Sequence, residues 1–244
     1  MILGASITGL AVARDAHRHG LRPVVVDSED GPALHSRCAT PVKVGAANEK
    51  ATIDRILSLC GPQAALISTS DQWIRFVIEH RSELSAAYAS IVQPDNTTLE
   101  LCLDKRAFSD WCIASGLPCP PAWTPGSGPR PASLRFPVLL RPIRTLHGSR
   151  ELDLPKAVQA LDESELAHWL AQFEAKQILP LVSESLLGRS LEQYSVPFAR
   201  KGTDILLFTA RKVRPSAELC QTGTCVEMCV DNRVEQWLEM QSNA

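Results

Sequence analysis

The sequence predicts an α/β protein in which a parallel sheet forms within the first hundred residues. A glycine-containing turn, Gly4–Gly9, separates a short apolar strand, Met1–Leu3, from a helical pattern. Two later apolar runs, Pro23–Asp27 and Ala64–Ser68, are typical of buried strands, and helical patterns lie between and after them. Because strands that alternate with helices usually pair in parallel, we expect a sheet built from βαβ units.

The helices of this region follow from apolar spacing and stop signals. Leu10–His19 has apolar residues at helical spacing, and Gly20 stands where a glycine cap ends a helix. Lys50–Cys60 is predicted as a second helix, and Asp71–Tyr88 as one longer amphipathic helix.

The composition is that of a globular chain. The 244 residues are 45% hydrophobic and 21% charged, with 25 Lys and Arg against 27 Asp and Glu. These fractions exclude collagen-like, coiled-coil and wholly disordered classes. The net charge of −2 and the lack of a basic stripe argue against a nucleic-acid partner. No segment approaches the roughly 20 apolar residues of a membrane helix, so we expect no membrane partner.

The N-terminus and the cysteines predict a cytoplasmic location. Met1–Ser6 lacks the basic residues with which a signal peptide begins. Eight cysteines without a secretory signal are typical of reduced thiols in a cytosol.

The Gly4–Gly9 turn has part of a dinucleotide-binding pattern. Gly4 and Gly9 occupy the outer positions of G-x-G-x-x-G, and Asp27 ends the next strand, where an acid can bind a ribose. Ser6 replaces the middle glycine, which lets the backbone approach a pyrophosphate. The serine favours a turn used only for packing. A flavin- or nicotinamide-dependent oxidoreductase is the alternative.

A second part of the chain begins near residue 101. A helix is predicted from Leu101 to about Ala114, and a connection rich in proline and glycine follows near 116–135, where we expect a mobile surface segment. Further predicted elements are a helix at Glu163–Lys176 and strands at Phe136–Pro142, Ile178–Val182, Leu191–Pro197 and Thr203–Lys212, the last entered by a Lys201-Gly202 turn.

Four motifs occur in order in this second part. They are Asp104-Lys105 at a helix start, Pro137-Val138-x-x-Arg141-Pro142, Ser183-Glu184-Ser185-Leu186-Leu187-Gly188, and Ala210-Arg211-Lys212-Val213-Arg214-Pro215. The ordered set resembles the ATP-grasp superfamily, in particular its carboxylate-amine ligase-like members. The resemblance implies an α/β fold in which a Rossmann-like pre-ATP-grasp domain, residues 1–100, precedes an incomplete ATP-grasp α+β domain, residues 101–244.

The resemblance also implies an ATP site. Its residues are Lys105, Arg141, Ser183, Glu184, Leu186, Glu192, Lys212 and Arg214. The four cations bring positive charge to the phosphates. Ser183, Glu184 and the backbone of Leu186 edge the adenine, while Glu192 faces the ribose hydroxyls. The family usually has a lysine where this sequence has Arg141, and an arginine can bind phosphate through two parallel N–H donors.

Each of these residues also has an ordinary structural interpretation. Lys105 can be a solvated lysine at a helix start, and Arg141 can form a surface ion pair. Glu184 and Glu192 can be exposed strand acids, and the basic run Arg211–Arg214 is typical of a solvated edge strand. The occurrence of all four motifs in one order favours the ATP site.

The reaction implied by the resemblance is ATP-dependent ligation. Such ligases activate a carboxylate as an acyl phosphate, which an amine or similar nucleophile attacks, and Mg²⁺ bridges the phosphates. The family's metal-binding acids, a Glu on a late strand and a Glu-x-Asn-x-Arg segment, are not found in this sequence. The catalytic residues are therefore unassigned, and no metal ligand is named. A non-catalytic nucleotide-binding remnant of the fold is the alternative.

The short C-terminal part has a consequence for association. If the last layer of the fold is missing, apolar strand faces at Ile205–Phe208 and Val226–Val230 are expected to be exposed. The sequence therefore predicts a tendency to self-associate, beside a nucleotide and an unknown carboxylate as small-molecule partners.

Overall fold

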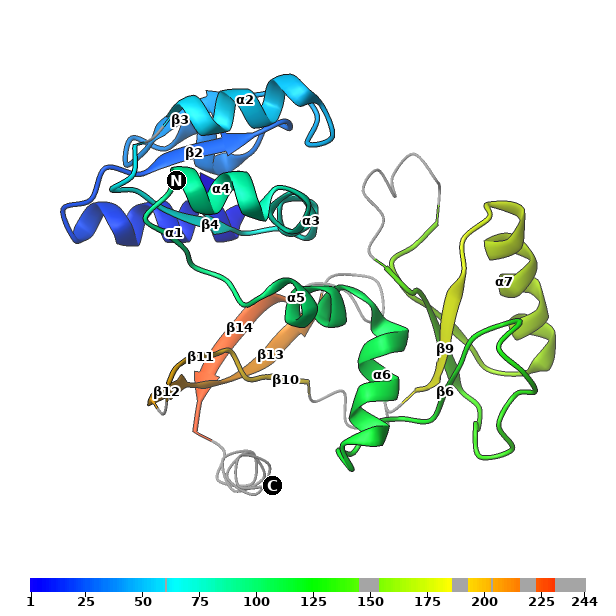
Figure 1. Ribbon diagram of the computed structural model, residues 1–244. Helices are drawn as coiled ribbons and strands as arrows, with labels where there is room; N and C mark the ends of the chain where they lie inside the picture. Colours follow the sequence, from blue (N-terminus) through cyan, green and yellow to red (C-terminus); the bar gives the residue numbers. More distant parts are fainter. Residues whose placement is uncertain (60, 145–153, 186–192, 203, 216–222, 231–244) are drawn as a thin grey trace. The chain divides into compact units, whose positions relative to one another are not determined.

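The computed structural model describes residues 1–59, 61–144, 154–185, 193–202, 204–215 and 223–230. The chain forms two compact units, Met1–Leu103 and Asp104–Ala244 (Figure 1). Within the described ranges, no helix has both the length and the apolar character needed to cross a membrane.

The first unit is built on a five-stranded parallel sheet, which confirms the predicted α/β class. The strand order is β3-β2-β1-β4-β5, and each neighbouring pair is parallel. The strands are β1 (Ile2–Leu3), β2 (Val24–Asp27), β3 (Thr40–Lys43), β4 (Ala65–Ser68) and β5 (Ser90–Ile91). The helices are α1 (Ile7–Arg18), the 3-10 helix η1 (Pro32–His35), α2 (Lys50–Leu59), α3 (Asp71–Glu79), α4 (Arg81–Ala87) and α5 (Asn96–Leu103).

Side chains of this sheet alternate between two apolar cores, as the pleat of a strand requires. Leu3 and Val26 pack in a core with residues of α2, α3 and α4, at the centre of which lies the fully buried Trp73. Ile2 and Val25, each one residue earlier, belong to a second core with residues of α1 and η1. Both faces of the sheet are therefore covered, which explains the continuous apolar runs in the sequence.

Local details of this unit differ from the sequence-based prediction. Asp71–Tyr88 is two helices, because the first ends at His80 and the second starts from it. The break allows Phe76 and Leu84, on its two sides, to be buried in the same core. Helix α1 begins at Ile7, three residues before the expected start. The short strands β3 and β5 were not predicted.

The second unit contains a four-stranded antiparallel sheet of order β6-β9-β7-β8. The strands are β6 (Ala122–Trp123), β7 (Val138–Pro142), β8 (Val158–Ala160) and β9 (Pro180–Glu184), and the helices are α6 (Lys105–Ala114) and α7 (Glu163–Ala175). Leu140 and Val182 pack in one core with Phe173 of α7. Figure 1 shows the sheet between α6 and α7.

The proline- and glycine-rich connection near 116–135 contains paired and buried residues. It contains β6, whose Ala122 and Trp123 pair with Ser183 and Val182 of β9. Leu134 is buried in the α7 core, and Arg130 forms a bidentate ion pair with Glu163. Long-range pairing therefore joins these residues to the sheet, and the mobility of the connection stays a prediction.

The remaining strands form a three-stranded sheet and a hairpin. The sheet has the antiparallel order β10-β13-β14, and the hairpin pairs β11 with β12. The strands are β10 (Tyr194–Ser195), β11 (Phe198–Lys201), β12 (Asp204–Leu207), β13 (Thr209–Pro215) and β14 (Gly223–Cys229). The predicted strand Thr203–Lys212 is thus divided between β12 and β13. Since β13 is the central strand of its sheet, the interpretation of Arg211–Arg214 as an edge strand is wrong.

Apolar side chains of these strands are exposed, as the sequence predicts. The exposed residues include Ile205, Leu206, Leu207, Phe208, Val226, Met228 and Val230. Leu206 and Met228 each expose 72% of their surface. Exposed apolar patches of this kind are sites of association.

We therefore predict concentration-dependent self-association of the chain. The double variant Leu206→Arg/Met228→Arg should shift the sedimentation distribution toward monomer, because each arginine places a charge on an exposed apolar site. A matched double variant at exposed neutral polar positions, Gln63→Arg/Gln172→Arg, should leave the distribution unchanged. A wild-type chain that stays monomeric at every concentration would contradict the prediction.

Candidate functional site

The Gly4–Gly9 turn of the first unit is tightly packed. Gly4 has a φ of +113°, a conformation that glycine adopts without strain. A Cβ atom at Gly9 would collide with the carbonyl oxygen of Gly4, and one at Gly4 would collide with the hydroxyl of Thr69. These two glycines allow α1 to lie close to the end of β1.

Asp27 is bound by donors of the protein itself. Its Oδ2 accepts a hydrogen bond from the Ala5 N–H at 2.5 Å. Its Oδ1 accepts from the Ser28 N–H at 2.8 Å and the Trp73 indole N–H at 3.1 Å. The Ala5 carbonyl in turn accepts from the Ala33 N–H at 3.0 Å. A ribose would have to compete with these donors, so the geometry favours the packing interpretation of the turn over a dinucleotide site.

In the second unit, the start of α6 contacts the chain just after β7, and each of these two elements carries a predicted cation. The backbone N–H of Lys105 donates to the Ile143 carbonyl at 3.0 Å, and its Nζ lies 3.4 Å from the same oxygen. Arg141 stands two residues earlier on β7, and its side chain is half-buried. Lys105 and Arg141 therefore come from two different elements that meet at one end of the sheet.

Strand pairing decides which other predicted residues share a face with Arg141. Residues paired across a sheet point to the same side, and Arg141 pairs with Leu181 while Leu139 pairs with Ser183. Val138, Leu140 and Val182 belong to the α7 core. Ala122, Leu139, Arg141, Leu181 and Ser183 therefore form the opposite side of the sheet, which we call the second face.

The predicted adenine-edge residues are divided by this alternation. Ser183 lies on the second face and is only 4% exposed. Glu184 pairs with Val138, so its side chain is on the α7 side, while its backbone N–H donates to the Pro121 carbonyl at 3.0 Å. Leu186 lies outside the described residues. The structure thus places Ser183, but not the Glu184 carboxylate, on the same face as Arg141.

Lys212 and Arg214 lie on β13, in a different sheet from β7. The Lys212 ammonium donates to the Gln193 side-chain oxygen at 3.1 Å. The pairing register with β14 shifts between Lys212 and Arg214, so a regular two-residue alternation does not relate their side chains. Glu192, the predicted ribose contact, lies outside the described residues.

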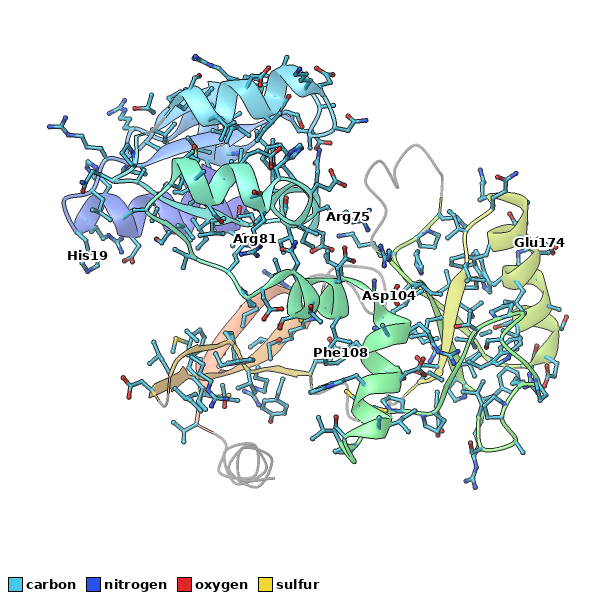
Figure 2. The ribbon with its side chains drawn as sticks, in the orientation of Figure 1. His19, Arg75, Arg81, Asp104, Phe108 and Glu174 are labelled. Carbon is cyan, nitrogen blue, oxygen red and sulfur yellow. The ribbon has the colours of Figure 1, made fainter. Side chains whose placement is uncertain are left out.

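Sequence reasoning missed Arg144, which joins the group at the start of α6. The Arg144 Nε donates to Asp104 Oδ2 at 3.1 Å. Asp104 Oδ1 accepts from the N–H groups of Arg106 and Ala107, both at 3.0 Å, and so caps the helix. The side-chain sticks of Figure 2 include Asp104, labelled at the beginning of α6. The only signal in the sequence was a second arginine three residues after Arg141.

The pKa of the Asp104 carboxyl lies below its ordinary value. Burial raises this pKa, but the bonds from the Ala107 N–H, the Arg144 guanidinium and the Arg106 N–H together outweigh burial. The carboxylate form therefore stabilises the folded state above the unfolded pKa of about 3.9, and this stabilisation is lost as the pH falls through the lower folded value.

We expect Asp104→Asn to remove this acid dependence while preserving the cap, because asparagine also caps helices well. The difference in free energy of unfolding between the wild type and Asp104→Asn should be largest above pH ~4 and shrink on further acidification. Urea denaturation at a series of pH values measures it. A difference that grows as the pH falls would contradict the assignment.

The described residues do not include a metal-binding cluster. Across those ranges, no group of three or more His, Cys, Asp or Glu side chains could hold a metal ion.

Comparison with known proteins adds evidence on the fold. No protein-family model and no curated protein matches this sequence. Solved structures do match. Carboxyaminoimidazole ribonucleotide synthase from Aspergillus clavatus, complexed with ATP, has a TM-score of 0.70 at 12% identity, over 99% of this chain and 60% of that one. The L-amino acid ligase of Bacillus licheniformis gives 0.70 at 12% identity, over 99% of this chain and 58% of that one.

A third similar structure is the D-alanine–D-alanine ligase of Bacillus anthracis, with a TM-score of 0.61 at 12% identity. It is matched over 99% of this chain and 75% of its own length. The chain thus spans about 60% of the first two structures and three quarters of the third. At these identities the likeness establishes the fold, and the chain has the fold of the ATP-grasp superfamily.

Proposed function

We propose that the chain binds ATP through its second unit, with the phosphates at the meeting point of α6 and β7. The observation that carries this proposal is the contact of Lys105 with the carbonyl of Ile143, two residues after Arg141. Two cations from different elements can hold a polyanion from two sides, and an arginine can do so through paired N–H donors. The fold supports the proposal, since one of the similar structures contains ATP.

The second face supplies what a nucleotide base requires beside these cations. Leu139 and Leu181 are apolar, and Ser183 and Gln159 are polar residues of the same face, with the Gln159 amide donating to the Ser185 hydroxyl at 3.0 Å. Binding sites for small molecules combine apolar walls with a few fixed polar groups in this way. Leu181 and Ser183 are themselves only 2% and 4% exposed, so we propose that the adenine lies at the rim of this face, with Ser183 at its edge.

The proposed ATP site extends to residues at other places in the chain. Lys212 and Arg214 on β13 would contribute further positive charge to the triphosphate. Leu186 and Glu192 remain the proposed adenine and ribose contacts. In this assignment residues 1–100 are the pre-ATP-grasp domain, of Rossmann-like type, and residues 101–244 carry the nucleotide.

The chemistry proposed for the chain is ligation of a carboxylate to an amine or a similar nucleophile. Transfer of the terminal phosphoryl group of ATP to the carboxylate would give an acyl phosphate and ADP. Attack of the nucleophile on the acyl carbon would then release inorganic phosphate. Since no metal-binding cluster was found in the described ranges, a nucleotide-binding protein without ligase activity is the second candidate. ATP binding is common to both candidates.

Calorimetric titration of the chain tests the proposal. We expect heat of binding with ATP and none with NAD or FAD. The Asp27 carboxylate oxygens, which a ribose would need, already accept hydrogen bonds from the protein. Titrations with and without magnesium distinguish a metal-dependent site from a nucleotide site that works without it. Absence of any ATP binding, or preferential binding of FAD, would overturn the proposal.

A further inference from the structure

The end of β7 is fixed by a set of contacts that continues past Arg141. The Ile143 N–H donates to the Leu179 carbonyl at 3.1 Å, and the Ile143 carbonyl accepts from the Lys105 N–H and Nζ. Residue 143 is therefore held from both sides, by the start of β9 and by the start of α6. Arg144 is the next residue along the chain after Ile143.

The two carboxylate oxygens of Asp104 bind different partners at the start of α6. One carboxylate oxygen caps α6 by accepting from the N–H groups of Arg106 and Ala107. The other oxygen holds the Arg144 guanidinium at 3.1 Å. Since the cap already uses these helix N–H groups, an anion at the start of α6 would have to bind side chains rather than those amides.

Arg144 remains accessible to a ligand although Asp104 holds it. Its side chain is 49% exposed, whereas that of Asp104 is 19% exposed. A guanidinium is a planar fork of N–H donors, and Asp104 orients that of Arg144 through its Nε–H. An arginine anchored through Nε by a carboxylate is already oriented, so less conformational freedom is lost when it binds phosphate.

We propose that Arg144 is a third phosphate-binding residue, which contacts the β- and γ-phosphates, and that Asp104 positions it. The inference rests on the proposed ATP site and extends it. Lys105, Arg141 and Arg144 then form one group of cations at the junction of α6 and β7, and the group distinguishes nucleoside triphosphates and diphosphates from monophosphates.

The test is a set of dissociation constants for ATP, ADP and AMP with purified full-length variants whose thermal unfolding and circular dichroism match the wild type. Arg144→Gln should weaken ATP binding about tenfold, the effect of one charge-assisted contact, and leave AMP binding within about twofold. Arg144→Lys should recover part of the loss, because it restores the charge without the fork. Arg135→Gln, an exposed arginine before β7, is the matched control and should bind all three nucleotides like the wild type.

The Asp104→Asn variant tests whether Asp104 positions Arg144 or only stabilises helix α6. Asp104→Asn keeps the cap but weakens the anchor, so it should weaken ATP binding in the wild-type background and cause no further loss in Arg144→Gln. Equal losses in both backgrounds would show that Asp104 does not act through Arg144.

The remaining outcomes are distinguishable. If Arg144→Gln binds ATP like the wild type while Arg141→Gln does not, the inference on Arg144 is wrong and the proposed ATP site stands. If Arg144→Gln weakens the binding of ATP, ADP and AMP equally, Arg144 does not contact the β- and γ-phosphates and the inference is wrong. If the wild type binds no nucleotide, the proposed function and this inference both fall.

Discussion

Asp27→Ala should lower the free energy of unfolding by about 2–4 kcal/mol, one of the largest effects of any polar substitution in the chain. The change removes the acceptor of the Ala5, Ser28 and Trp73 N–H donors. Trp73 is fully buried, so its indole N–H has no ready access to water as a substitute. Urea denaturation measures the loss.

Asp30→Ala is the matched control for this prediction. Asp30 follows the same strand, but 68% of its side chain is exposed, and its partner is the exposed His35. Its loss should cost less than about 0.5 kcal/mol. If Asp27→Ala unfolds like the wild type but binds a dinucleotide less tightly, Asp27 is a ligand residue and the packing interpretation of the turn is wrong.

Arg141→Ala should weaken ATP binding about 10- to 100-fold, because a hydrogen bond to a charged group is worth about 1.5–3 kcal/mol. Lys105→Ala should produce a loss toward the lower end of this range, since a lysine acts as a point charge without the fork of an arginine. Titration calorimetry gives both values. Arg135→Ala removes the same charge from an exposed position of the same unit and should leave the affinity unchanged.

The salt dependence of binding separates charge from packing in these variants. Raising the ionic strength should weaken ATP binding by the wild type more than by Arg141→Ala, since screening acts on the charge that the variant has lost. Parallel salt dependences for the two proteins would place the phosphates away from Arg141.

The parts of the fold that the sequence predicted are those with local signals. Asp104 at the start of α6 is an N-cap residue, and its side chain does accept from two helix N–H groups. Val24–Asp27 is a strand because its apolar run is covered on both faces of the sheet. Signals of this kind need no knowledge of distant residues.

The errors have a common cause in distant contacts. Ala122–Trp123 lies in a proline-rich stretch and becomes β6 only because β9 pairs with it. The helix break at His80 follows from burial of residues on both sides in one core. Two-residue strands such as β5 have too few residues for an apolar pattern to be recognised.

Part of the candidate site could also be predicted from the sequence, and part could not. Lys105 and Arg141 were found from motifs, and the contacts of Ile143 bring their two elements together. A ribose-binding role for Asp27 was the alternative that the sequence left open because Asp27 ends a strand, and the contacts from Ala5 and Trp73, on other elements, favour packing instead. Arg144 could not be selected from sequence, since its partner Asp104 lies 40 residues away.

Hydrogen exchange of the chain with and without ATP tests the central claim most directly. We expect ATP to slow exchange in the β7 segment, Val138–Arg144, and at the start of α6, and to leave exchange in the Gly4–Gly9 turn and the Asp27 segment unchanged. Protection confined to Gly4–Gly9 and Asp27, or no protection anywhere at saturating ATP, would contradict it.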